Sequence, residues 1–118
     1  YHALDGTAPA TTSAHVIGDI IRGEIGFDGM LMSDDLSMEA LAGTLAERAD
    51  ASFAAGCDMA LHCNGIMSQM EEVASVCPVL EGKALERAAS ALSRIGTPQE
   101  IDVDALREEY RQILEPVA

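Results

Sequence analysis

The sequence predicts an α/β fold built around a short parallel sheet. Two short apolar runs, residues 30–32 and 59–63, begin about 30 residues apart, which is the usual length of one strand-plus-helix unit. Turn residues bound each run, and a segment with helical periodicity follows each one. Strands that alternate with helices in this way are typical of proteins with parallel sheets, because parallel neighbours need a helical crossover.

The elements before the first strand are predicted from local signals. Residues 1–12 are rich in Gly, Pro and Thr and are expected to form a loop. Apolar residues then recur at helical spacing, so residues 13–25 are predicted to be a helix that Ser13 caps and Gly26 ends. The Gly-Phe-Asp-Gly sequence that follows is typical of a turn.

The first strand is expected over residues 30–33, with the acidic pair Asp34-Asp35 at its end. A helix should follow over residues 36–55, and the Gly43-Thr44 pair could interrupt it. The second strand, residues 59–63, ends at Asn64-Gly65. Three further helices are predicted over residues 66–76, 83–95 and 103–114, of which the last two are amphipathic.

Two strand–helix units make up only a quarter of a (β/α)₈ barrel, which takes about 250 residues. The 118 residues of this chain have room for one small domain. We therefore predict that residues 1–95 are βα units of an incomplete barrel. Residues 96–118 should form a C-terminal helical extension, and the last helices could cover the closing end of the barrel. The chain opens on Tyr1 rather than Met, as expected of a fragment or a processed chain.

The composition excludes several classes of partner. Twenty acidic residues against seven basic ones give a formal charge of −13, which repels nucleic acid and anionic membranes. No apolar run approaches the roughly 20 residues of a membrane span, and the N-terminus lacks the order of a signal peptide. The three cysteines contain no CxxC pair, which favours a reducing cytoplasm over a disulfide framework.

A metal site is not predicted, although Cys57, His62 and Cys63 lie close together in the sequence. On a buried strand, such side chains are more often small core fillers or structural groups than ligands. We predict no metal and no cofactor.

The acidic pair is the main candidate for chemistry. In α/β barrels, catalytic side chains lie where a strand ends and its loop begins, and Asp34 and Asp35 occupy that place. A carboxylate there can attack the anomeric carbon of a sugar and form a covalent glycosyl-enzyme. Strand alternation puts Asp34 on the face of Met30 and Met32 and Asp35 on the opposite face. One of them can therefore be a nucleophile while the other caps the next helix. Capping, metal binding or solvation would each also explain an isolated acidic pair.

A series of short motifs supports the catalytic interpretation. In order, they are PATTS at 9–13, Arg22, GFDG at 26–29, SDDLSM at 33–38, AGCDM at 55–59 and HCN at 62–64. Together, over residues 1–95, they resemble the family 3 β-N-acetylglucosaminidases of peptidoglycan recycling. The resemblance implies that residues 1–95 are the C-terminal βα units of a (β/α)₈ barrel, whose remaining part lies upstream. The SDDLSM run is the most specific of these motifs, and the resemblance implies that its first Asp, Asp34, is the nucleophile.

The resemblance also implies a retaining mechanism on terminal N-acetylglucosamine, with GlcNAc–1,6-anhydro-muramyl peptides as the carbohydrate substrate. It implies an acid/base His on a mobile loop, together with a Lys-His pair and an Arg that hold the sugar, all upstream of the matched region. This chain alone is therefore expected to be inactive. Asp5 and Asn64 lie at segment ends that would face the same mouth, and we predict that they bind substrate.

Two other functions remain open from the sequence. The chain could be an acidic interaction module without catalysis, although such a surface would not need the SDDLSM run. It could also be a phosphoryl-transfer enzyme or metal-dependent hydrolase that uses Asp34 and Asp35 on Mg²⁺. No glycine-rich phosphate loop accompanies the pair, which argues against the second alternative.

Overall fold

The computed structural model describes residues 1–114 and confirms an α/β arrangement with two adjacent parallel strands. In chain order the elements are η1 (Ala10–Thr12), η2 (His15–Glu24), β1 (Met32–Asp35), α1 (Leu45–Ala55), β2 (Met59–Leu61), α2 (Met67–Ala74), α3 (Gly82–Leu92) and α4 (Val103–Leu114). β2 lies within its predicted range, whereas β1 lies two residues later than the predicted 30–33, so that the acidic pair forms its last two residues. The apolar runs and their spacing were therefore sufficient to predict two parallel strands, but not the bounds of the first.

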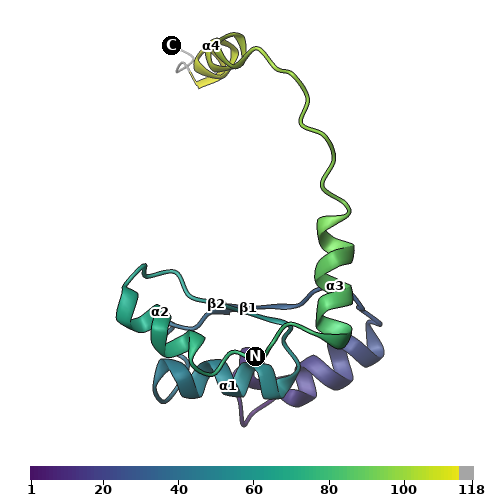
Figure 1. Cartoon of the computed structure of the whole chain (residues 1–118), viewed down its shortest axis with the longest axis vertical. Helices are drawn as coiled ribbons and strands as arrows, with labels where there is room; N and C mark the ends of the chain where they lie inside the picture. The colour runs from purple at the N-terminus through teal and green to yellow at the C-terminus, as the bar shows by residue number, and fades with distance from the viewer. Residues whose placement is uncertain (115–118) are drawn as a thin grey trace.

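One face of the sheet is covered by helices. In Figure 1, α1 and α2 lie along the same side of β1 and β2. The core between these layers consists of small aliphatic side chains in two clusters, one around Leu36 and Ala49 and one around Ile17 and Ala55. On the opposite face of the sheet, Met32 keeps 45% of its surface exposed. The sheet is thus packed on one face and open on the other.

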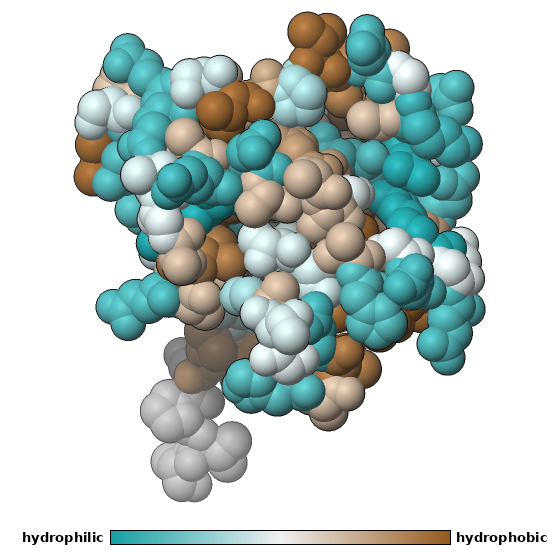
Figure 2. All heavy atoms as spheres, turned by 90° about the horizontal axis from the view of Figure 1, so that it is seen from below, coloured by the Kyte–Doolittle hydropathy of each residue, from teal (hydrophilic) through white to brown (hydrophobic). Residues whose placement is uncertain are grey.

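The outer side of the helix layer has a mixed surface. Figure 2 views the molecule from the side where α1 lies in Figure 1, and hydrophilic side chains there surround smaller groups of hydrophobic ones. Such a distribution is ordinary for helices that face solvent. The surface that differs from that of a closed fold is therefore not the outer side of the helices but the open face of the sheet.

The helix predicted over residues 36–55 is wrong in its first half. Residues 36–44 form turns instead, and α1 begins only at Leu45. The Arg48 guanidinium donates to the carbonyl oxygens of Leu36, Met38 and Gly43, so it satisfies groups that a continuous helix would have paired internally.

The start of α1 has a clear local cause. Gly43 has a φ of +87°, a left-handed conformation that ends any preceding helical path. Thr44 and Glu47 then form a capping box, in which the Thr44 hydroxyl accepts from the Glu47 N–H and the Glu47 carboxylate accepts from the Thr44 N–H. The break that Gly43-Thr44 could introduce is therefore a true helix start.

The first helix lies close to its prediction. η2 covers His15–Glu24 with π-type hydrogen bonding, against a predicted range of 13–25. The Ser13 hydroxyl accepts from the Val16 N–H at 3.0 Å, so Ser13 caps this helix as expected. Gly26 follows with a φ of +70°.

The C-terminal helices differ in how they join the rest of the molecule. The structure gives α2 and α3 shorter ranges than the predicted 66–76 and 83–95, and α4 begins at its predicted residue, Val103, and reaches Leu114, the last described residue. α3 is bonded to the sheet region through Arg87, whereas α4 stands clear of it at the end of an extended segment (Figure 1). The expectation that the last helices could cover the closing end of the barrel stays a prediction, and in this structure α4 does not lie against the sheet (Figure 1). The boundary at residue 95 stays a prediction, and residues 115–118 of the predicted extension lie outside the described residues.

The cysteines need one correction. Cys57 is buried in the core, as expected, but Cys63 and Cys77 are exposed. β2 ends at Leu61, two residues before the predicted end, so Cys63 lies in the following loop rather than on a buried strand.

Candidate active site

The carboxyl end of β1 contains a β-bulge next to the acidic pair. Met32 pairs with Met59 and Asp35 with Leu61, so three steps along β1 correspond to two along β2. The Ser33 hydroxyl accepts the Leu61 N–H at 2.9 Å and takes the place of a backbone acceptor in the ladder. Bulges re-aim neighbouring side chains and are common beside active sites.

Asp34 is exposed at this bulge. Within residues 1–114, its carboxylate accepts one hydrogen bond, from the Asp35 N–H at 2.8 Å. Met32 on the same face is also exposed, while Ser33 between them is buried toward the helices. Asp34 therefore presents a carboxylate at the strand end, on the open face of the sheet, as the alternation predicts.

Asp35 has a different environment. Its carboxylate accepts the hydroxyl and the N–H of Ser37, the latter at 3.0 Å, and the Cys63 N–H at 3.3 Å. The Ser37 bonds, with a smaller contribution from Cys63 and from His62 nearby, hold the pKa of Asp35 below its usual value. Asp35 thus caps the turn after β1 and links it to the end of β2. The helix-capping role left open for one of the two acids is wrong for Asp35, because no helix begins there.

Asn64 lies beside this turn, as the sequence suggested. Its side-chain oxygen is 3.4 Å from the Ser37 hydroxyl, and its amide donates to Gln69 at 3.3 Å. These side chains line a shallow, open cavity between the loops that follow β1 and β2, together with Arg48 and Glu72. Asn64 therefore shares a loop cluster with the end of β1, and its binding role stays a prediction.

Asp5 has a structural use in the N-terminal loop. One carboxylate oxygen accepts the N–H and hydroxyl of Thr7 and the Ala8 N–H, and the other accepts the Ser13 hydroxyl at 2.6 Å. These bonds, the one from Ser13 first, lower the pKa of Asp5 well below its usual range. Because Ser13 also caps η2, Asp5 fixes the loop to that helix. Its predicted role in substrate binding has no support beyond this position and stays a prediction.

A second charged cluster lies at the opposite end of the strands. The Asp58 side chain is only 6% exposed and accepts Arg22 at 2.7 Å and Arg87 at 3.0 Å. It also accepts the Leu31 N–H at 2.8 Å, just before β1. Burial alone would raise the pKa of Asp58, but the Leu31 N–H and the two guanidinium groups lower it below its usual value. This network joins η2, α3 and the starts of both strands.

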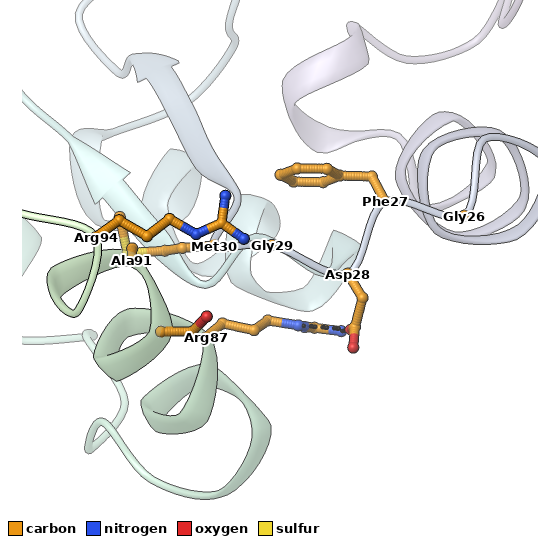
Figure 3. A pocket seen from close by; sticks show the side chains of 9 residues that line it. Gly26, Phe27, Asp28, Gly29, Met30, Arg87, Ala91 and Arg94 are labelled. Carbon is orange, nitrogen blue, oxygen red and sulfur yellow. Dashed lines mark hydrogen bonds and ion pairs between the residues drawn. The ribbon is translucent and has the colours of Figure 1, made fainter.

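The cavity in Figure 3 is next to this network. It has a volume of about 530 Å³, and Arg87 reaches across it toward Asp28 while the Phe27 ring lies on the other side. That volume could hold a small ligand. However, the cavity lies beside residues that precede β1, whereas α/β barrels place catalysis at the carboxyl ends of their strands. We therefore assign the candidate active site to the Asp34 end.

The structure offers little for a metal-dependent mechanism on the acidic pair. In the part of the chain described, no three His, Cys, Asp or Glu side chains form a group that could hold a metal ion. Both oxygens of Asp35 already accept hydrogen bonds from the protein, so it is poorly placed to share a cation with Asp34.

None of the helices between residues 1 and 114 has the length and apolar character that crossing a bilayer requires.

Sequence reasoning missed two residues of this site. Ser33 belongs to the SDDLSM motif, and in the structure its hydroxyl completes the bulge by accepting the Leu61 N–H. No sequence pattern signals that a side-chain hydroxyl takes the place of a backbone acceptor. His62 was interpreted as merely structural, but it lies 3.8 Å from Asp35 and is bonded to Gln69. Its place two residues before Asn64, near the end of a predicted strand, was the available signal.

Comparisons with known proteins give consistent matches. The family model described as "Glycosyl hydrolase family 3 N terminal domain" matches residues 1–98. The chain is 44% identical over 97 residues to a protein named beta-hexosaminidase from Chromobacterium violaceum, covering 80% of this chain and 26% of the relative. Proteins of the same name match at 52% over 66 residues in Alkalilimnicola ehrlichii (54% and 19%) and at 37% over 114 residues in Aromatoleum aromaticum (93% and 31%). The chain thus spans less than a third of the length of these relatives.

Proposed function

The chain belongs to glycosyl hydrolase family 3, and from this membership we propose that it supplies Asp34 as the nucleophile of a retaining β-N-acetylhexosaminidase. The two βα units would be the C-terminal part of a (β/α)₈ barrel, and the upstream part of the same barrel would complete the enzyme. Asp34 attacks the anomeric carbon, and water later hydrolyses the glycosyl-enzyme.

The environment of Asp34 is the observation that carries this proposal. A nucleophilic carboxylate must be accessible and must not be fully bonded within its own protein. Asp34 is exposed and accepts only the Asp35 N–H among the described residues, whereas Asp35 is bonded to two segments. The difference supports Asp34 as the reacting group and Asp35 as a residue that stabilises the turn.

The proton donor must come from outside the described acidic pair. Retaining glycosidases need an acid about 5 Å from the nucleophile to protonate the leaving oxygen. Asp35 cannot serve, because its pKa is lowered and its oxygens are bonded to Ser37 and Cys63. The proposal therefore assigns the acid/base role to the upstream part of the barrel, where the family resemblance places a His.

The substrate and setting are proposed from the relatives and from the chain's composition. The matched proteins are named beta-hexosaminidase, which supports a terminal hexosamine as the sugar. From the motif resemblance we further propose that this sugar is N-acetylglucosamine and that the substrate is a GlcNAc–1,6-anhydro-muramyl peptide. Asn64, beside the Ser37 turn, would contact the substrate at the mouth. Three unpaired cysteines, two of them exposed, support a cytoplasmic location.

A chimeric enzyme tests the proposal. This chain replaces the matching segment of the Chromobacterium violaceum relative, with which it is 44% identical over 97 residues. Hydrolysis of a chromogenic N-acetylglucosaminide is then measured for the parent chimera and for Asp34→Asn and Asp35→Asn. Asp34→Asn should lower kcat about 10⁴-fold, on the order of 5 kcal/mol of barrier, because the amide is a very poor nucleophile.

The matched Asp35→Asn variant should lose less than tenfold, since it removes a turn contact rather than the reacting group. If both variants lose activity equally, or if Asp34→Asn stays near full activity, the assignment of the nucleophile is wrong.

A further inference from the structure

His62 is a buried imidazole next to the candidate active site that the proposed mechanism does not use. Its side chain is 5% exposed. Nε2 lies 3.1 Å from the Gln69 amide oxygen, whereas Nδ1 is buried and has no hydrogen-bond partner within the described residues. Nδ1 points to Asp35, whose nearer oxygen is 3.8 Å away. A buried polar atom without a partner is costly, so this ring nitrogen calls for an explanation.

The neighbours of His62 decide which nitrogen carries a proton. Asp35 is a carboxylate at neutral pH, because its hydrogen bonds lower its pKa. A bare Nδ1 lone pair would face this negative charge at 3.8 Å, which is unfavourable, whereas an Nδ1–H is attracted to it and needs only a small movement to bond.

The other ring nitrogen is compatible with this arrangement. Gln69 can offer Nε2 its amide oxygen or, with the amide turned over, its amide nitrogen, since the two atoms are assigned from the network. The Asn64 amide also donates to that Gln69 oxygen, at 3.3 Å, so the Asn64 amide must turn over together with that of Gln69. Either orientation of the Gln69 amide is compatible with a proton on Nδ1.

Two other charged side chains near this end of the sheet, besides Asp34 and Asp35, are already engaged. Arg48 of α1 donates to the Leu36, Met38 and Gly43 carbonyl oxygens, and Glu72 of α2 accepts the Ala46 N–H. Among the ion pairs of the described residues, the one that includes His62 is with Asp35.

We propose that His62 is a positioning residue that donates from Nδ1 to Asp35 and thereby holds the turn next to Asp34 in place. Asp35 already links Ser37 in this turn to Cys63 after β2. His62 adds a second link from the end of β2, and Gln69 extends it to α2. The Asp34 backbone directly precedes this anchored residue, so loss of the contact would let the carboxylate move. The effect on catalysis rests on the proposed role of Asp34, whereas the contact itself does not.

The proton position can be measured without any activity. In the chimera described above, histidines are labelled with ¹⁵N, and the His62 signals are identified by their loss in His62→Gln. Long-range proton–nitrogen spectra at pH 7 should show a proton on Nδ1. A neutral ring with its proton on Nε2 alone would overturn the proposal. An inactive parent chimera would count against the proposed function and would leave this result in force.

Two substitutions at His62 test the positioning role. The amide nitrogen of His62→Asn lies near the place of Nδ1, whereas that of His62→Gln lies near the place of Nε2. His62→Asn should therefore keep kcat within about threefold of the parent, and His62→Gln should lower it about tenfold with KM changed less than twofold. Equal losses of kcat in the two variants, or a loss confined to KM, would overturn the role.

Discussion

Replacing Asp58 with alanine should destabilise the protein strongly, although this residue lies at the end of the sheet away from Asp34. The change removes the carboxylate shared by Arg22 and Arg87, whose side chains are only 16% and 17% exposed, and the acceptor of the Leu31 N–H. Breaking a buried ion pair from one side costs about 3–5 kcal/mol, and the partial exposure of both guanidinium groups favours the lower end. The unpaired N–H adds about 1 kcal/mol, so we expect a total of about 4 kcal/mol.

The measurement is urea unfolding of the chimera, read from the midpoint and the slope of the transition. Asp28→Ala is the matched control, because Asp28 also bonds to Arg87, at 2.6 Å, but is 63% exposed. Water and salt screen this surface pair, so its loss should shift the midpoint little. If Asp58→Ala shifts the midpoint no more than Asp28→Ala, the network does not stabilise the fold in the way described.

Three further predictions concern stability. Gly56→Ala should cost about 1–2 kcal/mol in urea unfolding, because Gly56 has a φ of +111° and an added Cβ would lie 3.1 Å from Ile17. Gly65→Ala should cost less, because Gly65 has a φ of +66° but open space around it. Equal losses of unfolding free energy in the two variants would refute the contact with Ile17. The pKa values of Asp35 and Asp58 are lowered in the folded state, so the contributions of these residues to stability are present above the unfolded pKa near 3.8 and are lost as pH falls through the folded pKa values. Melting temperatures measured between pH 2 and 6 should therefore decline on the acid side. A melting temperature that does not change with pH would contradict this. The 118-residue chain alone, with one face of its sheet open, should form oligomers in sedimentation or melt without a sharp transition in calorimetry. A monomer with a sharp two-state transition would argue against the incomplete-barrel interpretation.

The strands and most helices could be predicted because their signals are local. The apolar runs and the turn residues around them were enough to place β2 and, with a shift of two residues, β1, and the amphipathic pattern of residues 103–114 predicted the start of α4. The helix predicted from residue 36 was wrong because Arg48 of α1 bonds the carbonyl oxygens of Leu36, Met38 and Gly43, a contact that periodicity does not reveal. The true start of α1 did have a local signal, the capping box of Thr44 and Glu47.

Some features of the candidate site could likewise be predicted from the sequence, and others could not. Strand alternation was sufficient to separate Asp34 from Asp35, because it depends only on residue order. The bulge at Ser33 was not predictable, since it depends on a hydroxyl that replaces a backbone acceptor of the partner strand. The structural use of Asp5 depends on Ser13, eight residues away, and also required the folded chain to be seen.

The most direct test of the central claim is to identify the residue that bonds covalently to the sugar. The chimera is treated with a 5-fluoro-N-acetylglucosaminyl fluoride, which slows hydrolysis of the glycosyl-enzyme, and the labelled peptide is mapped by mass spectrometry. Because the exposed Asp34 carboxylate is proposed to attack the anomeric carbon, the label should be found on Asp34 and should be absent from the Asp34→Asn variant. A label on Asp35, or one that persists in Asp34→Asn, would contradict the account.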